Sequence, residues 1–334
     1  DFNYTKVKKK MLKKKPKVFI TRRLPKKIET RMMELFDTTL NDTDLLLKED
    51  ELISVFKKYE IIVPSIADNI SKRVIQNAGL QLRLIANFGA GVDHIDIEEA
   101  KEKNLIVTNT PGYLADDTAD LVMSLLLALP RRLYEGSRVV ANGSWNGWSP
   151  TSLLGNRIYG KRLGIIGMGR IGRAVAHRAK AFGISIHYHN RKRLPSLMEE
   201  EYDATYWKNL DEMIPRMDII SVNCPLTNAT KGLLSSQRLK LMTKDSYLIN
   251  SSRSEIVDEK ALAYMLKEKK IAGAGLDVFS GKKDDTSQLL ELSNTILIPH
   301  MGSATIEGRI EMGEKVIVNI KTYIDGHNPP NRII

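Results

Sequence analysis

Short hydrophobic runs alternate with polar stretches of helical spacing through the first third of the chain. The strand-like runs there are Val18–Thr21, Ile61–Val63, Leu82–Ala86 and Ile106–Thr108. The helical patterns between them include Lys27–Phe36 and Ser71–Asn77. Such alternation is typical of a parallel sheet with helices on both faces. The pattern therefore predicts an α/β unit here.

A second series of strand-like runs occupies the chain from Arg162 to about Pro299. These runs are Arg162–Ile166, Ile184–His189, Ile219–Asn223, Tyr247–Asn250, Gly275–Val278 and Thr295–Ile298. A helical pattern from about Thr305 to Ile324 has no strand after it, so we expect it to pack on the first unit. The chain thus predicts a discontinuous domain, residues 17–113 and 301–334, into which a second doubly wound domain, residues 114–300, is inserted.

An almost wholly apolar stretch, Ala119–Leu129, lies between the two series. Asp116, Asp117 and Thr118 precede it and offer helix-capping groups. A helix that is apolar on every side must be buried. We expect this one to lie between domains or between subunits.

A glycine fingerprint follows the strand-like run Arg162–Ile166. Its residues are Gly167-Met168-Gly169-Arg170-Ile171-Gly172, and an Ala-rich helical pattern comes next. In a strand–turn–helix context these glycines allow a sharp turn, a close approach of backbone to a pyrophosphate, and tight helix–strand packing. The helix N-terminus adds free N–H groups. The pattern predicts a dinucleotide site; the alternative is a tight turn without a ligand.

The end of the next predicted strand bears on the choice of dinucleotide. A free ribose 2′-hydroxyl usually meets an Asp or Glu about 20 residues past the glycines. This chain has Asn190, Arg191, Lys192 and Arg193 there. A carboxylate would repel a 2′-phosphate, whereas an Arg fork can bind one. We therefore expect NADP(H) to be preferred, with NAD(H) as the alternative cofactor; a solvated basic loop is the other interpretation.

Composition supports a two-domain protein of a reducing compartment. The chain has 334 residues, 42% of them hydrophobic, which suffices for two cores. A single cysteine, Cys224, excludes a disulfide framework and favours a cytoplasmic location. The longest apolar run, Leu121–Leu129, is too short to span a bilayer, and no secretory signal is apparent.

The positive charge is concentrated at the beginning of the chain. Residues 1–17 hold eight Lys and one Asp, so they carry +7 of the net charge of +11 and leave +4 for the rest. Such a lysine block is typical of a solvated tail, which we expect to be disordered over residues 1–16. It lacks interleaved aromatic residues and amphipathic spacing, so we expect neither a nucleic acid nor a membrane as partner.

Three polar segments follow predicted strands of the second series. They are Asn223–Leu226, Asn250–Arg253 and Pro299–Ser303. Ligands on open parallel sheets bind beyond the carboxyl ends of the strands. These segments should therefore gather around the reactive end of the dinucleotide.

With these motifs the chain resembles the D-isomer-specific 2-hydroxyacid dehydrogenases, in particular the glyoxylate and hydroxypyruvate reductases. The resemblance covers about residues 17–332 and includes Ile85–Asp93, Thr110–Gly112, the glycine fingerprint, Gly275–Phe279 and Pro299–Thr305. It implies a Rossmann cofactor domain inserted into a flavodoxin-like substrate domain. The implied reaction transfers hydride from NADPH or NADH to C2 of a small 2-oxo acid, glyoxylate or hydroxypyruvate, and yields glycolate or D-glycerate.

The resemblance also implies roles for individual residues. Arg253 would bind the substrate's carboxylate and carbonyl oxygen, a task suited to a charged planar fork, and His300 would donate the proton. Backbone N–H groups of Ala90, Gly91 and Val92 would anchor the carboxylate. The cofactor contacts, with no metal involved, would be Thr118, Gly167, Gly169, Arg170, Ile171, Gly172, Asn190, Arg191, Lys192, Arg193, Cys224, Pro225, Ser251, Ser252, Asp277, His300 and Gly302.

Three of these residues also have plain structural interpretations. Arg253 alone would suit a surface ion pair, His300 a buried structural histidine, and Asp277 a cap. Their joint spacing favours the catalytic interpretation. Cys224 has no histidine partner in prospect, so we expect no nucleophile there.

One position departs from the family pattern. The family places a Glu 29 residues after the arginine, where it favours the protonated form of the histidine; this chain has Lys282. A nearby cation would disfavour imidazolium. Asp284 or Asp285 could substitute, Lys282 could face solvent, or the chain could bind cofactor as a sensor without turnover. We expect a working reductase whose activity fades at lower pH than in relatives with the Glu, and Lys282→Glu should raise the rate at neutral pH.

The resemblance finally implies a two-fold homodimer formed through about residues 112–150. Trp145 and Trp148 lie in the loop that follows the long apolar helix. One of them would reach the partner's pocket, or both would serve as aromatic anchors of the dimer.

Overall fold

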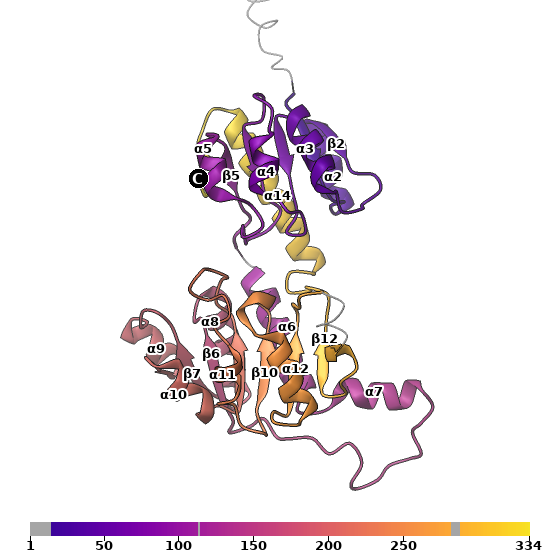
Figure 1. Ribbon diagram of the computed structural model, residues 1–334, viewed down its shortest axis with the longest axis vertical. Coiled ribbons are helices and arrows are strands. Elements are labelled where there is room, and N and C mark those ends of the chain that lie inside the picture. The colour runs from indigo at the N-terminus through magenta and orange to yellow at the C-terminus, as the bar shows by residue number, and fades with distance from the viewer. Residues whose placement is uncertain (1–14, 113, 282–287) are drawn as a thin grey trace, which may run out of the picture. The chain divides into compact units, whose positions relative to one another are not determined.

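The computed structural model describes residues 15–112, 114–281 and 288–334. These fall into two compact units. One comprises the described residues up to Gly112 together with Thr305–Ile334, and the other comprises those between them. Figure 1 shows the elements of each unit.

The first unit is built on a five-stranded, all-parallel sheet. Its strands are β1 (Lys17–Ile20), β2 (Asp37–Leu40), β3 (Ile61–Val63), β4 (Leu84–Ala86) and β5 (Ile106–Thr108). Their spatial order, β2-β1-β3-β4-β5, is that of the flavodoxin-like doubly wound folds. The hydrophobic pattern does not predict β2, because it is an edge strand of only four residues, Asp-Thr-Thr-Leu, and none of them is fully buried.

Among the described residues, five helices complete this unit. They are α2 (Lys26–Leu35), α3 (Glu49–Lys58), α4 (Lys72–Gln76), α5 (Ile97–Glu102) and α14 (Ile306–Ile324). As expected, α14 packs within the first unit, against α2 and β4. The end of the chain covers the edge of the sheet, because Ile333 N–H donates to Val107 O at 2.8 Å and Arg332 forms a bridge with Thr108. A strand edge is thereby closed to other pairing.

The second unit has a seven-stranded parallel sheet. Its strands are β6 (Arg162–Ile166), β7 (Ser185–His189), β8 (Ala204–Tyr206), β9 (Ile219–Val222), β10 (Tyr247–Asn250), β11 (Gly273–Leu276) and β12 (Thr295–Leu297). The order β12-β11-β10-β9-β6-β7-β8 runs outward in both directions from β6 and β9. This is the Rossmann arrangement, with its switch of direction between β6 and β9. The edge strand β8 is likewise short, and none of its residues is fully buried, so the pattern does not predict it.

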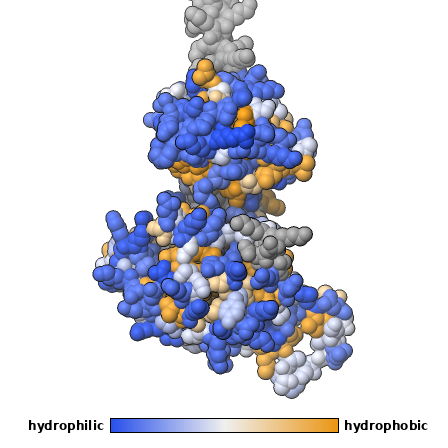
Figure 2. All heavy atoms as spheres, viewed as in Figure 1, coloured by the Kyte–Doolittle hydropathy of each residue, from blue (hydrophilic) through white to orange (hydrophobic). Residues whose placement is uncertain are grey.

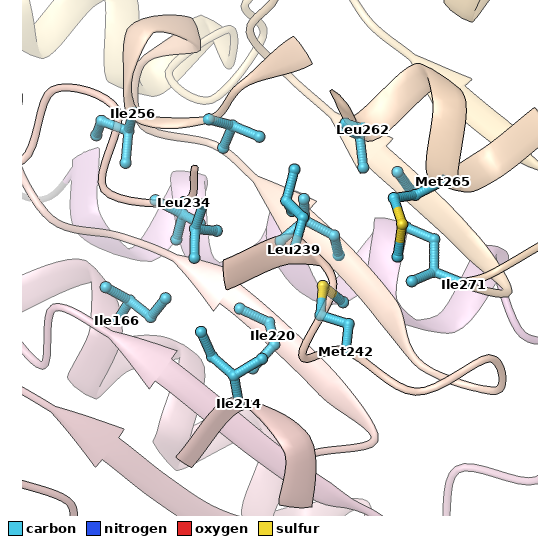
Figure 3. Close-up of a cluster of buried hydrophobic side chains, with 14 of the residues drawn as sticks. Ile166, Ile214, Ile220, Leu234, Leu239, Met242, Ile256, Leu262, Met265 and Ile271 are labelled. Atoms are coloured by element: carbon cyan, nitrogen blue, oxygen red, sulfur yellow. The ribbon is translucent and has the colours of Figure 1, made fainter. Parts of the chain in front are cut away.

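Helices cover both faces of this sheet. They are α6 (Leu114–Ala128), α7 (Leu133–Ala141), α8 (Arg170–Ala181), α9 (Ser196–Tyr202), α10 (Leu210–Met213), α11 (Ser236–Leu239) and α12 (Glu259–Lys267). One apolar cluster joins α6 and α8 to the sheet. The other, on the α11–α12 side, is shown in Figure 3, where Ile220 and Leu239 are among the fully buried side chains.

The expectation that Asp116 and Asp117 precede the apolar helix needs correction. α6 begins at Leu114, so Asp116 and Asp117 lie in its first turn rather than ahead of it. There they suit the positive end of the helix dipole, and Asp116 also pairs with Arg178 of α8 at 3.0 Å. The buried face of α6 packs against α8 and the sheet of its own unit. Its apolar character therefore has an explanation within the second unit.

Among the described helices none is both long and apolar enough to cross a membrane.

Candidate active site

The glycine turn between β6 and α8 has the geometry that a dinucleotide requires. Gly167 has φ +98°, and a Cβ there would lie 2.6 Å from Cys224 N. A Cβ on Gly172 would lie 2.3 Å from Gly167 O, so the helix can approach the strand only because this residue is glycine. A Cβ on Gly169 would meet no atom within 4 Å. The turn therefore keeps open space ahead of α8.

Free backbone donors border that space. No side chain caps α8 at Gly169. The N–H groups of Gly169, Arg170 and Ile171 pair with no acceptor in the described part of the chain. Unpaired N–H groups and the helix dipole favour a phosphate group at this position. The residues present thus fit the pyrophosphate of a dinucleotide.

Asn190 has a structural role that the sequence did not indicate. Its Oδ1 accepts a hydrogen bond from Met168 N–H at 2.8 Å, which ties the end of β7 to the glycine turn. The Tyr206 hydroxyl donates to Asn190 O at 3.2 Å. Asn190 therefore fixes the shape of the cradle, and its predicted contact with the cofactor stays a prediction.

The three cations after β7 differ in their surroundings. Glu199, a buried carboxylate, accepts from the Arg193 fork at 2.7–3.0 Å and from the Tyr188 hydroxyl. These donors lower the pKa of Glu199. Burial, together with the bond to Glu199, raises the pKa of Tyr188 to about 12. Arg191 and Lys192 are exposed and have no ionic partner among the described residues. Arg193 is thus paired within the unit, whereas Arg191 and Lys192 are available to bind an anion.

The loops after β9 and β10 are joined to each other. The Ser252 hydroxyl donates to Cys224 O, and the Ser251 hydroxyl lies 3.5 Å from Asn223 Oδ1. Cys224 is buried, and burial raises the pKa of its thiol to about 11. The thiol is therefore protonated at neutral pH, which agrees with the expectation that it is no nucleophile. Pro225 follows it at the same edge of the sheet.

Arg253 lies three residues beyond β10 and is partly buried. The Asn250 side chain donates to Arg253 O at 2.9 Å. The guanidinium in turn donates through Nη1 to Ser252 O at 2.8 Å. Both bonds orient the arginine from the end of its own strand.

His300 lies three residues beyond β12 in a strained conformation. Its φ is +52°, which is uncommon for a residue with a Cβ. The buried Asp277 holds this turn. Its backbone oxygen accepts from His300 N–H at 2.9 Å, and its carboxylate accepts from Met301 N–H at 2.5 Å and Gly302 N–H at 2.9 Å. The Thr118 hydroxyl donates to Gly302 O at 3.1 Å. Asp277 and Thr118, predicted as cofactor contacts, thus also shape the histidine turn.

The order of strands brings these groups to one edge of the sheet. β10, β11 and β12 are neighbours, and Arg253, Asp277 and His300 follow them in that order. Parallel strands end at the same edge, so the guanidinium and the imidazole share the carboxyl edge with the glycine turn. Lys282, Asp284 and Asp285 lie outside the described residues.

The predicted carboxylate anchor belongs to the first unit. Ala90, Gly91 and Val92 follow β4 at the carboxyl edge of the five-stranded sheet. Ala90 is exposed, and the other two are partly exposed. No acceptor among the described residues pairs with their three N–H groups.

Comparison with known proteins places the chain in a family. Residues 123–302 match the family model of the D-isomer specific 2-hydroxyacid dehydrogenase NAD binding domain. A glyoxylate reductase of Thermococcus litoralis is 41% identical over 323 residues, which cover 96% of this chain and 97% of that protein.

Solved structures agree with this assignment. A structure assigned to the D-isomer specific 2-hydroxyacid dehydrogenases from Polaromonas sp. JS6 66 is 38% identical, with a TM-score of 0.89 over 96% of this chain and 99% of the other. An NADPH-dependent glyoxylate/hydroxypyruvate reductase from Sinorhizobium meliloti, in complex with NADP and malonate, is 30% identical with a TM-score of 0.84, over 96% and 97%. The chain belongs to the D-isomer-specific 2-hydroxyacid dehydrogenases, a family of nicotinamide-dependent oxidoreductases.

Proposed function

We propose that this protein reduces a small 2-oxo acid, glyoxylate or hydroxypyruvate, to the corresponding 2-hydroxy acid. The observation that carries the proposal is the shared edge: a guanidinium follows β10 and an imidazole follows β12, the two strands that flank β11 in the sheet that bears the dinucleotide cradle. The relatives support the choice of acid. The Thermococcus litoralis protein is a glyoxylate reductase, and the Sinorhizobium meliloti enzyme is a glyoxylate/hydroxypyruvate reductase.

Each group has a separate task in this reaction. Bound NADPH supplies a hydride to C2 of the acid. Arg253 binds the substrate's carboxylate and carbonyl oxygen and stabilises the negative charge that develops on that oxygen. His300 donates the proton that completes the hydroxyl group. Free N–H groups at residues 90–92 anchor the carboxylate. Hydride and proton together convert the carbonyl to an alcohol.

NADPH is the preferred cofactor in this proposal. Arg191 and Lys192 provide uncommitted positive charge beyond β7, where a 2′-phosphate would bind. No carboxylate occupies positions 190–193 to accept a ribose hydroxyl. The binding of NADP by the Sinorhizobium meliloti relative agrees with this choice.

The protein is also proposed to act as a homodimer. α7 and the following loop, residues 142–158, project from the second unit and expose several apolar side chains (Figures 1 and 2). Tyr134 and Val140 are 51% and 62% exposed, and Trp145 and Trp148 are 62% and 85% exposed. A projection of this kind is typical of a protein–protein contact. A second copy of the chain is the partner we propose, with one tryptophan reaching the partner's pocket or both anchoring the dimer.

A steady-state assay tests the function directly. Oxidation of NADPH and NADH is followed with glyoxylate, hydroxypyruvate, pyruvate and 2-oxobutyrate. We expect turnover with the first two acids. Arg253→Gln and His300→Gln should each lower kcat/KM by about a hundredfold or more. His177→Gln, on the exposed face of α8, serves as control and should leave kcat/KM unchanged. Tight NADPH binding without turnover of any acid would instead indicate a cofactor sensor.

A further inference from the structure

The loop that carries the proposed carboxylate anchor is held by its carbonyl groups. Gly89 O accepts from the Asn87 side chain and from Thr110 N–H, both at 3.0 Å. Gly91 O accepts from the second N–H of the Asn87 amide at 2.9 Å. A single side-chain amide therefore binds two carbonyls of the loop.

A second asparagine binds the carbonyl between them. Asn109 Nδ2 donates to Ala90 O at 2.8 Å. The backbone of Asn109 is itself fixed, since its N–H donates to Asn331 O at 3.1 Å and its carbonyl accepts from the buried Asn319 of α14 at 3.1 Å. Three consecutive carbonyls, those of Gly89, Ala90 and Gly91, are thus all held by donors.

Asn87 is saturated in this arrangement. Its side chain is fully buried, and both amide N–H groups are donated. Its Oδ1 lies 3.0 Å from His94 Nε2. Because an amide oxygen can only accept, His94 carries a proton on Nε2. A buried amide with all of its hydrogen bonds directed at one loop has a fixed orientation.

The held carbonyls belong to the peptides that carry the anchor N–H groups. In a trans peptide the carbonyl oxygen of one residue and the N–H of the next point in opposite directions across the C–N bond. Gly89 O shares its peptide with Ala90 N–H, Ala90 O with Gly91 N–H, and Gly91 O with Val92 N–H. Tying down the three oxygens therefore turns each N–H group away from the donor that holds its peptide and fixes its direction.

We propose that Asn87 and Asn109 are positioning residues for substrate binding: they preorganise the N–H groups of residues 90–92 for a carboxylate without touching it. The inference rests on the proposed function, which supplies that carboxylate. Preorganised donors bind an anion without the cost of reorienting peptides at the moment of binding. Loss of either asparagine should therefore weaken binding of the acid and spare the cofactor.

Asn109→Ala is the primary test, because Asn109 is partly exposed and its backbone bonds survive the substitution. KM for glyoxylate and Ki for oxalate, an unreactive carboxylate, should each rise roughly tenfold. KM for NADPH, kcat and Tm should change little. The control is Asn77→Ala, which removes an exposed amide that donates to Arg73 O at 2.9 Å in the same unit and should leave KM and Ki unchanged. Asn109→Leu keeps the branched shape of the side chain without its donor and should behave as Asn109→Ala does.

Two further comparisons make the outcome decisive. Asn87→Ala frees Gly91 O and removes one of the two donors to Gly89 O, so we expect a larger rise in KM and Ki, together with a lower Tm. If Asn109→Ala and Asn109→Leu melt like the wild type and keep its KM and Ki, or if Asn77→Ala shifts these constants equally, the inference is wrong. Two measurements separate the positioning role from the proposed function. A wild type without turnover in the kinetic assay contradicts the function. Oxalate affinity that calorimetry finds unchanged in the variants contradicts the positioning role.

Discussion

At the scale of single residues, two buried carboxylates of the second unit fix the positions of functional groups. Asp277 holds the turn at His300 through its carboxylate and its backbone oxygen. Glu199 binds the Arg193 fork and lowers the charge available beyond β7. A guanidinium already paired in bidentate fashion gains less from a phosphate than an unpaired one does. Any preference for a 2′-phosphate should then depend mainly on Arg191 and Lys192.

Cofactor selectivity should show this difference. We expect Arg191→Ala combined with Lys192→Ala to raise KM for NADPH by about tenfold or more and to leave KM for NADH nearly unchanged. Lys231→Ala, which removes an exposed cation elsewhere in the unit, is the control. Steady-state kinetics with both cofactors measures the effect. A larger loss of NADPH selectivity in Arg193→Ala than in the double variant would show that the pairing with Glu199 does not limit Arg193.

At the scale of elements, the β6–turn–α8 segment depends on the close approach of helix and strand. A Cβ on Gly172 would lie 2.3 Å from Gly167 O and 3.1 Å from Ile165 Cγ2. Backbone oxygen cannot move aside as a flexible side chain can. By contrast, a Cβ on Gly136 in α7 would meet only Leu153 Cδ1, at an ordinary 3.6 Å.

These two glycines predict opposite effects of the same substitution. Gly172→Ala should lower the free energy of unfolding by about 1–3 kcal/mol and raise KM for NADPH, since α8 must move away from the turn. Gly136→Ala should be neutral or stabilise by up to about 1 kcal/mol, because alanine is the better helix former. Denaturant unfolding with and without NADPH measures both. Equal stabilities for the two variants would contradict the close packing at Gly172.

At the scale of the whole molecule, the two units have separate sheets and separate cores, while α7 contributes no buried residue to either core. Exposed tyrosine, valine and tryptophan side chains in such a segment are costly unless they are covered by another surface. A second copy of the chain is the cover proposed above.

Light scattering after size exclusion tests this assembly. We expect the wild type to be a dimer and Tyr134→Glu combined with Val140→Glu to shift it to monomer, since two charges would be buried without partners. Leu197→Glu is the matched control: Leu197 is 79% exposed on α9, away from the projection. A wild type that elutes as a monomer would contradict the proposal, as would a double variant that remains a dimer.

The amino-acid pattern was enough to predict the class of fold and to propose the residues of the site. Buried parallel strands are short apolar runs, so the central strands of both sheets could be predicted. The predicted ends of these strands differ from the observed ends by at most two residues. The edge strands β2 and β8 could not, because they are short and largely unburied. The glycine turn was readable because its constraints are local: a positive φ at Gly167 and contact between residues a few positions apart.

Which polar groups meet, by contrast, depends on the arrangement of the strands in space. Nothing local links Asn109 to Ala90, Asp277 to the His300 turn, or Thr118 to Gly302, a pair 184 positions apart. These bonds depend on which strands are neighbours, and the order of parallel strands is set by packing of the whole sheet rather than by the pattern of any one segment. Residue types could therefore suggest the chemistry, but the groups that orient it appear only once the strands are placed side by side.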